Sequence, residues 1–383
     1  MAPTRPKQKK SKNRDRAAKT INVRKILDSA TESLAQGAVH DALTLAKDAY
    51  KHITEEGRQA GAVLSLLGQI YVELGEVEKA RNYFLKAVSV DEDGTLPEDL
   101  GGGPEKFLWL AQLSEEGGQD SISWFERGAS VLRSQIQSLK ETIDSRPQSR
   151  GEVEAAIFEK NKKLAETLCA EAEVYMTDLS WEEDAEQQCE RLTAEAVMLA
   201  DDVAETWQTL ANVRISQTRT EEAKEALKRS MGIWSDLPPE DPRVPPYPTR
   251  VGLVRLLIEV GMEEEAIAVN ERLISEDDES VEVWYLGGYG RYTMGEKLKQ
   301  REGATKDDDS WQAFWRSSRK WLTRCLKIFD AEEYEDEKLR EHAQELLESI
   351  KAELGEAPDD DDDEDEVWED TDGEDADSDV EME

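Results

Sequence analysis

The chain has 383 residues, of which 38% are hydrophobic and 35% are charged, and its formal net charge is −39 at pH 7. A field of that sign repels nucleic acid and anionic lipid, so we expect no direct DNA binding and no membrane partner. The same field attracts basic proteins. No apolar run approaches the roughly 20 residues that a helix needs to cross a bilayer. The length fits two or three globular domains or one extended solenoid.

Residues 1–22 form a basic head without an apolar period, so we expect them to be disordered. Such a segment is typical of a nuclear localisation signal bound by an import receptor, and it predicts a protein that moves between nucleus and cytoplasm. An RNA-contacting arm or a solubilising extension would have the same composition. The residues of the candidate signal are Lys7, Lys9, Lys10, Lys12, Arg14 and Arg16.

Residues 23–330 are predicted to be helical almost throughout, as pairs of helices separated by loops. No stretch alternates as a β-strand does, so the predicted class is all-α. Proline, glycine and charged residues place the four clearest loops at residues 91–105, 145–151, 235–249 and 301–309.

The clearest helical pair covers Gly61–Val90, where apolar and small residues recur on one face of each helix. Its spacing resembles the tetratricopeptide repeat, a helical hairpin of 34 residues. The resemblance predicts a superhelical solenoid of about seven hairpins. The residues that carry it are Leu64, Leu67, Gly68, Tyr71, Ala80, Phe84 and Ala87. The frame begins again at Ala204, Tyr247 and Val281, with weaker copies at residues 23–51, 107–128 and 165–200.

Residues 331–357 are predicted to form a capping helix with one apolar face over the last repeat. That face consists of Leu339, Ala343, Leu346, Ile350 and Leu354. Residues 358–383 form a polyacidic tail that is expected to be disordered, because 17 of its last 25 residues are Asp or Glu. The tail could keep the protein soluble or could occupy the basic surface of a partner, and the aromatic Trp368 favours contact with a partner.

Catalytic chemistry has little support in the sequence. The three histidines are scattered, and the three cysteines lack metal-site spacing, so we expect no enzyme activity, no metal and no cofactor. The glycine-rich Gly101–Pro104 lacks the lysine of a phosphate loop and is interpreted as a flexible connection. A second glycine-rich stretch, residues 286–295, falls inside a helical frame, which excludes a dinucleotide-binding turn.

The repeat frame also places candidate binding residues. Repeat proteins that grip chaperone C-termini carry a Lys at slot 5 and an Asn at slot 9, and this pair is absent here. The inner slots instead hold acids and tyrosines, which suggests a concave surface for a basic and partly apolar extended segment. Alternatively, the tyrosines pack on the C-terminal helix and the glutamates are only solvated. The candidates are Glu73, Glu173, Glu205, Asn212, Glu259, Glu282, Tyr285, Tyr289 and Tyr292.

An acidic repeat solenoid between a basic head and a polyacidic tail resembles the fungal dedicated assembly chaperones of ribosomal protein L four. The resemblance implies a monomer that grips the long internal loop of the newly made ribosomal protein in a one-to-one complex. It also implies protection from aggregation and degradation, and escort into the nucleus for assembly of the large subunit. Two other interpretations remain: an acidic histone chaperone of the repeat class, or a scaffold subunit of a larger complex.

Overall fold

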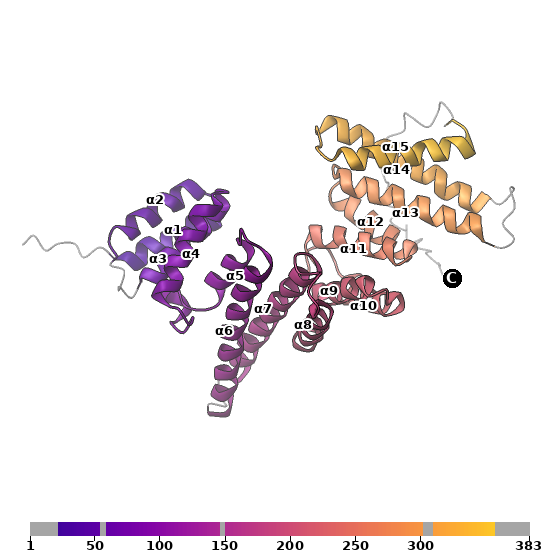
Figure 1. Ribbon diagram of the computed structural model, residues 1–383. Coiled ribbons are helices and arrows are strands. Elements are labelled where there is room, and N and C mark those ends of the chain that lie inside the picture. Colours follow the sequence, from indigo (N-terminus) through magenta and orange to yellow (C-terminus); the bar gives the residue numbers. More distant parts are fainter. Residues whose placement is uncertain (1–21, 54–58, 146–149, 302–308, 357–383) are drawn as a thin grey trace, which may run out of the picture. The chain divides into compact units, whose positions relative to one another are not determined.

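The computed structural model describes residues 22–53, 59–145, 150–301 and 309–356, and within these ranges it contains fifteen α-helices and one 3-10 helix (Figure 1). The chain divides into two compact units, residues 1–246 and 247–383, so the predicted solenoid of residues 23–330 spans both. The polyacidic tail and the candidate localisation signal lie outside the described residues.

The first unit contains five antiparallel helical pairs, in which each helix packs on the next one along the chain. The two longest helices are the second helix of the third pair, with 28 residues, and the first helix of the fourth pair, with 27 residues. The helices are α1 (Val23–Ala35), α2 (Val39–Tyr50), α3 (Ala60–Glu73), α4 (Val77–Val90), η1 (Glu98–Leu100), α5 (Glu105–Gln112), α6 (Gly118–Ser145), α7 (Arg150–Met176), α8 (Ala185–Leu199), α9 (Ala204–Ser216) and α10 (Thr220–Trp234).

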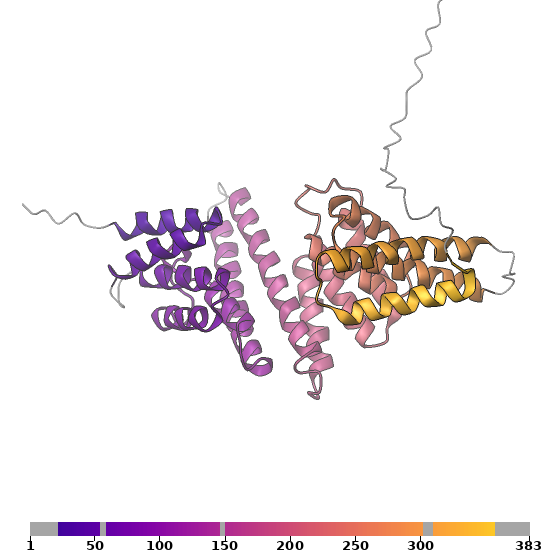
Figure 2. The same ribbon diagram turned by 90° about the horizontal axis from the view of Figure 1, so that it is seen from above.

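The second unit contains two further pairs and a last single helix, drawn in orange to yellow in Figure 2. The helices are α11 (Tyr247–Glu259), α12 (Glu263–Glu276), α13 (Val281–Gln300), α14 (Asp309–Ala331) and α15 (Glu337–Leu354). Seven pairs and a cap confirm the predicted fold class. The glycine-rich residues 286–295 lie inside α13, as predicted.

Small residues allow the two helices of a pair to approach closely, as the repeat frame predicted. A Cβ atom on Gly68 would lie 2.6 Å from the ring of Phe84, which is fully buried. In the last pair, a Cβ atom on Gly288 would lie 2.6 Å from the Leu322 side chain. The same slot of the frame therefore holds glycine for the same steric reason in both units.

In three of the five steps from one pair to the next within a unit, the first helices lie closer together than the second helices do. α1 contacts α3, α7 contacts α9 and α11 contacts α13, whereas the second helices of neighbouring pairs make no comparable contact within the described ranges. In a stack of helical hairpins, the side with the closer spacing is the concave side. The first helices therefore line the inner face of each unit.

Gly101–Pro104 is a packed turn and not the flexible connection expected from its composition. All four residues are buried, and a Cβ atom on Gly102 would lie 1.7 Å from the backbone oxygen of Leu96. Beside the turn, the Lys106 Nζ donates to Asp91 Oδ2 over 2.6 Å, and both side chains are almost fully buried. This buried ion pair fixes the start of α5.

The predicted capping helix is present as α15, which packs on α13 and α14. Ala343, Leu346 and Ile350 are buried in this contact, and the flanking Leu339 and Leu354 are half-buried. Among the helices described, none combines the length and the apolar character needed to cross a bilayer.

Candidate protein-binding face

A row of acidic side chains follows the inner face of α7 and continues on α9. Glu159, Glu166 and Glu173 are exposed and are spaced seven residues apart, which places them on one side of the helix two turns from each other. On the adjacent α9, Glu205 and Asn212 have the same spacing. We call these five residues the acidic face.

The carboxylates of the acidic face lie in a partly desolvated and negatively charged environment. Desolvation by the surrounding helices raises the pKa of Glu166. Lysines nearby oppose this shift, and the negative charges of Glu205 and Glu159 add to it. Desolvation also raises the pKa of Glu173. A cationic partner would relieve the cost of keeping these groups charged.

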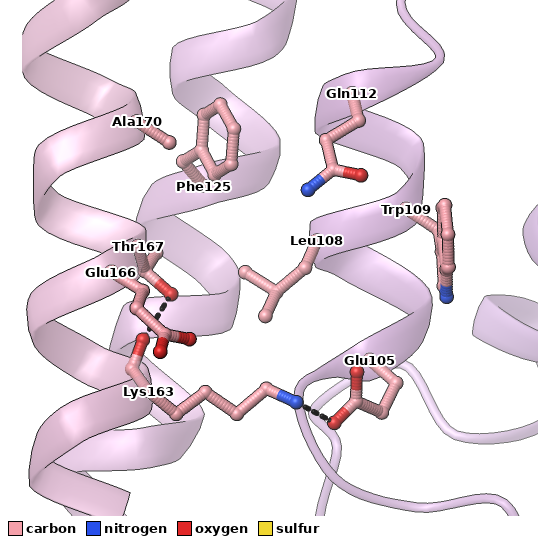
Figure 3. Close-up of a pocket in the computed structure, with 9 residues that line it drawn as sticks. All are labelled: Glu105, Leu108, Trp109, Gln112, Phe125, Lys163, Glu166, Thr167 and Ala170. Atoms are coloured by element: carbon pink, nitrogen blue, oxygen red, sulfur yellow. Dashed lines mark hydrogen bonds and ion pairs between the residues drawn. The ribbon is translucent and has the colours of Figure 1, made fainter. Parts of the chain in front are cut away.

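A pocket of about 230 Å³ opens beside this row, between α5 and α7 with α6 as its floor (Figure 3). Leu108 points into the gap between the helices, and the Lys163 side chain crosses the gap to form an ion pair with Glu105. The Thr167 hydroxyl donates to the Lys163 carbonyl over 2.8 Å. The lining residues are Glu105, Leu108, Trp109, Gln112, Phe125, Lys163, Glu166, Thr167 and Ala170.

The predicted acidic candidates are divided between the two units. Glu173, Glu205 and Asn212 come together on the acidic face, and Glu73 is exposed at the end of α3. The other two acidic candidates lie in the second unit. Glu259 is exposed at the end of α11, and Glu282 on α13 forms an ion pair with Arg255. The Glu282 charge is therefore already compensated.

The structure places the three candidate tyrosines against α15 and not in an open groove. The Tyr285 hydroxyl lies 2.7 Å from His342 Nδ1, and the Tyr292 hydroxyl lies 3.0 Å from Ser349 Oγ. The Tyr289 ring packs edge-on to His342, with ring centroids 5.5 Å apart. These contacts match the alternative interpretation of the tyrosines, so we leave them out of the acidic face.

Sequence reasoning missed several residues of this region. Glu166 occupies slot 2 of the same repeat frame that selected Glu173, so the frame itself could have found it. Glu159 precedes that frame and required knowledge of how far α7 extends. The pocket residues Leu108 and Trp109 lie in a repeat copy that is weak in sequence.

Reactive groups that could support catalysis are not gathered in the described part of the chain. No cluster of three His, Cys, Asp or Glu side chains in these ranges has metal-binding geometry. Cys169, Cys189 and Cys325 are free and buried. Burial raises the pKa of Cys169 and of Cys325 to about 12, so both remain protonated thiols in the core. The fold defines a helical-repeat protein, and the acidic face is its candidate surface for a protein partner.

Comparisons with known proteins place the chain more narrowly. Residues 62–93 match the tetratricopeptide repeat family. A protein of Emericella nidulans named "Probable assembly chaperone of rpl4" is 43% identical over 94% of this chain and 90% of its own length. A Schizosaccharomyces pombe protein of the same name is 32% identical over 90% of this chain and 95% of its own length.

A solved structure agrees with these relatives. The "Assembly Chaperone of RpL4 (Acl4) (Residues 1-338)" is 67% identical and superposes with a TM-score of 0.70. The match covers 74% of this chain and 100% of the other. The chain therefore belongs to the family of assembly chaperones of Rpl4, which confirms the resemblance stated from the sequence. It is a family of chaperones and not of enzymes.

Proposed function

We propose that this chain binds newly made Rpl4 in a one-to-one complex and holds a basic segment of it on the acidic face. The observation that carries the proposal is the row of carboxylates on α7 and α9. Neighbouring helices desolvate Glu166 and Glu173, and neither carboxylate forms an ion pair among the described residues. Proteins that bind rRNA present lysine and arginine to phosphates, and those groups are uncompensated before assembly. The family name of the relatives supports Rpl4 as the client.

The bound segment is the long internal loop of the client, in an extended conformation. An extended chain exposes its backbone and its basic side chains together, so several weak ion pairs act at once while each contributes little. Release requires no nucleotide, because rRNA is a denser polyanion and competes for the same positive charges. The acidic tail accelerates capture of the client through its long-range field.

The same complex enters the nucleus for assembly of the large subunit. The basic head supports this part of the proposal, since its lysine and arginine cluster has the composition that import receptors bind. The protein then returns to the cytoplasm for another client. The histone-chaperone and scaffold interpretations receive no support from the comparisons above.

Light scattering of Rpl4 on dilution into low-salt buffer tests the proposal. An equimolar amount of the chain should suppress aggregation of Rpl4, and the effect should weaken near 1 M salt, where charges are screened over about 3 Å. Polyglutamate of equal charge serves as a control for a purely electrostatic effect. Equal aggregation with and without the chain would contradict the proposal, and equal protection of core histones would favour the histone-chaperone alternative.

A further inference from the structure

The pocket between α5 and α7 contains a cation that belongs to the protein itself. Lys163 extends across the opening and forms an ion pair with Glu105 on the opposite helix (Figure 3). Its side chain therefore lies where a positively charged side chain of a client would approach the acidic face. The residues that line the pocket determine which other side chain could take the place of Lys163.

The interior of the pocket suits an apolar stem. Leu108 and Phe125 are 8% and 4% exposed and form an apolar surface together with Ala170. The Thr167 hydroxyl is already bonded to the backbone, so it requires no partner from a ligand. Lysine and arginine combine an apolar stem with a charged end and can use such a floor.

The rim of the pocket is charged. Glu166 makes no ion pair or hydrogen bond through its carboxylate among the described residues. Desolvation raises its pKa, the charges of Lys162 and Lys163 oppose this shift, and those of Glu205 and Glu159 add to it. The Lys163 and Glu105 side chains are 36% and 46% exposed. Ion pairs as exposed as this contribute little to stability, so an incoming cation can replace Lys163 at small cost.

We propose that this pocket binds one arginine or lysine side chain of the client, with its stem on Leu108 and Phe125 and its charge on Glu166. Lys163 occupies the same position when no client is bound and swings out when the client enters. The pocket then anchors one residue of an extended segment, whereas the rest of the acidic face attracts the segment without fixing its register. This inference rests on the proposed function and names a specific recognition element within it.

Affinity for full-length Rpl4, measured by biolayer interferometry, tests the proposal with two opposing substitutions. Glu166→Gln should weaken binding about tenfold, as expected for loss of a charge-assisted hydrogen bond. Lys163→Met should strengthen binding about two- to fivefold, because it removes a competitor worth no more than an exposed ion pair. A merely structural role for Lys163 predicts a loss of affinity and not a gain.

Matched controls separate the pocket from the general charge of the region. Lys160 lies one turn from Lys163 on α7, does not line this pocket and forms an ion pair with Glu98. Lys160→Met removes the same charge, and it should strengthen binding less than Lys163→Met does. Glu186→Gln removes one acid from α8 and should leave affinity unchanged. Circular dichroism of each variant verifies that the helices are intact.

A double-mutant cycle identifies the anchored residue. Glu166→Gln is combined in turn with Gln substitutions of the arginines and lysines of Rpl4, and we expect coupling with one position only. The residue type of Rpl4 at that position then shows whether the pocket holds an arginine or a lysine. Uniform coupling to all positions, or wild-type affinity of both pocket variants, would overturn the pocket assignment. Failure of the unmodified chain to bind Rpl4 would instead overturn the proposed function.

Discussion

Replacing Lys106 with methionine tests how the start of α5 is fixed. The Lys106 and Asp91 side chains are 1% and 3% exposed and their charged atoms are 2.6 Å apart. Asp91 Oδ1 also accepts hydrogen bonds from the backbone N–H groups of Thr95 and Leu96, at 2.9 and 3.2 Å. Lys106→Met keeps the apolar stem and leaves a buried carboxylate with only its backbone donors.

The free energy of unfolding of the first unit should fall by about 3 kcal/mol, at the lower end of the cost of breaking a buried pair because the backbone donors remain. Urea unfolding followed by circular dichroism should show a transition about 1 M lower, for a slope of roughly 2–3 kcal/mol per M. The double variant Asp91→Asn with Lys106→Met should regain part of this loss. If the single variant shifts the midpoint by less than about 0.3 M, which the same slope converts to less than 1 kcal/mol, the ion pair does not stabilise the start of α5.

Four further outcomes follow from the structure and the sequence. Burial raises the pKa of Asp91, but hydrogen bonds from Lys106 and the backbone outweigh it and hold the pKa below its usual value, so this stability is present at neutral pH and is lost as pH falls through the folded-state pKa. In the Lys106→Met variant, burial becomes the main influence on the pKa of Asp91 and raises it. The difference in urea midpoint between this variant and the wild type should therefore become smaller as the pH is lowered. Tyr285→Ala with Tyr289→Ala should destabilise the second unit by about 3 kcal/mol, measured by calorimetry, because α15 loses its contact surface, whereas a wild-type melting profile would place these rings elsewhere. Deletion of residues 359–383 should leave the melting temperature unchanged but slow association with Rpl4 and flatten its salt dependence in stopped-flow measurements; an identical salt slope would exclude a role in capture. Alanine at the four lysines of residues 7–12 should move a fluorescent fusion towards the cytoplasm, and an unchanged nuclear signal would exclude this import signal.

The helical pairs could be predicted because their spacing has a steric cause. Gly68 and Gly288 occupy equivalent slots, and each allows a large side chain of the second helix to approach. Such a constraint acts between residues close in the sequence and leaves a periodic pattern. The loops between helices were predictable for a related reason, since proline and glycine disfavour continuation of a helix.

The remaining features depend on contacts between distant segments. A run such as Gly101–Pro104 has the same composition in a flexible connection and in a packed turn, and the buried Lys106 beside it decides between them. Periodicity placed Tyr285 and Tyr289 on one face of α13, but only the tertiary structure shows that α15, about 50 residues later in the chain, covers that face.

Glu173 and Glu205 were predicted because both occupy inward-facing slots of the repeat frame. Glu205 lies near Glu166 because α9 contacts α7, which the frame alone does not show. The pocket beside them could not be predicted, because its two walls come from α5 and α7, which the long helix α6 separates in the sequence. Local patterns thus identify which residues face inward, and the packing of helices decides which of them meet.

The rate at which Rpl4 associates with variants of the acidic face shows whether this face is where the client binds. Stopped-flow rates at several salt concentrations would compare the wild type with a variant in which Glu159, Glu173 and Glu205 are all glutamine. The matched control changes three exposed glutamates on second helices, which are Glu78, Glu186 and Glu225. We expect slower association and a smaller salt slope for the acidic-face variant only, since long-range attraction depends on where the charge lies. Equal rates for the two triple variants would contradict binding of Rpl4 at this face.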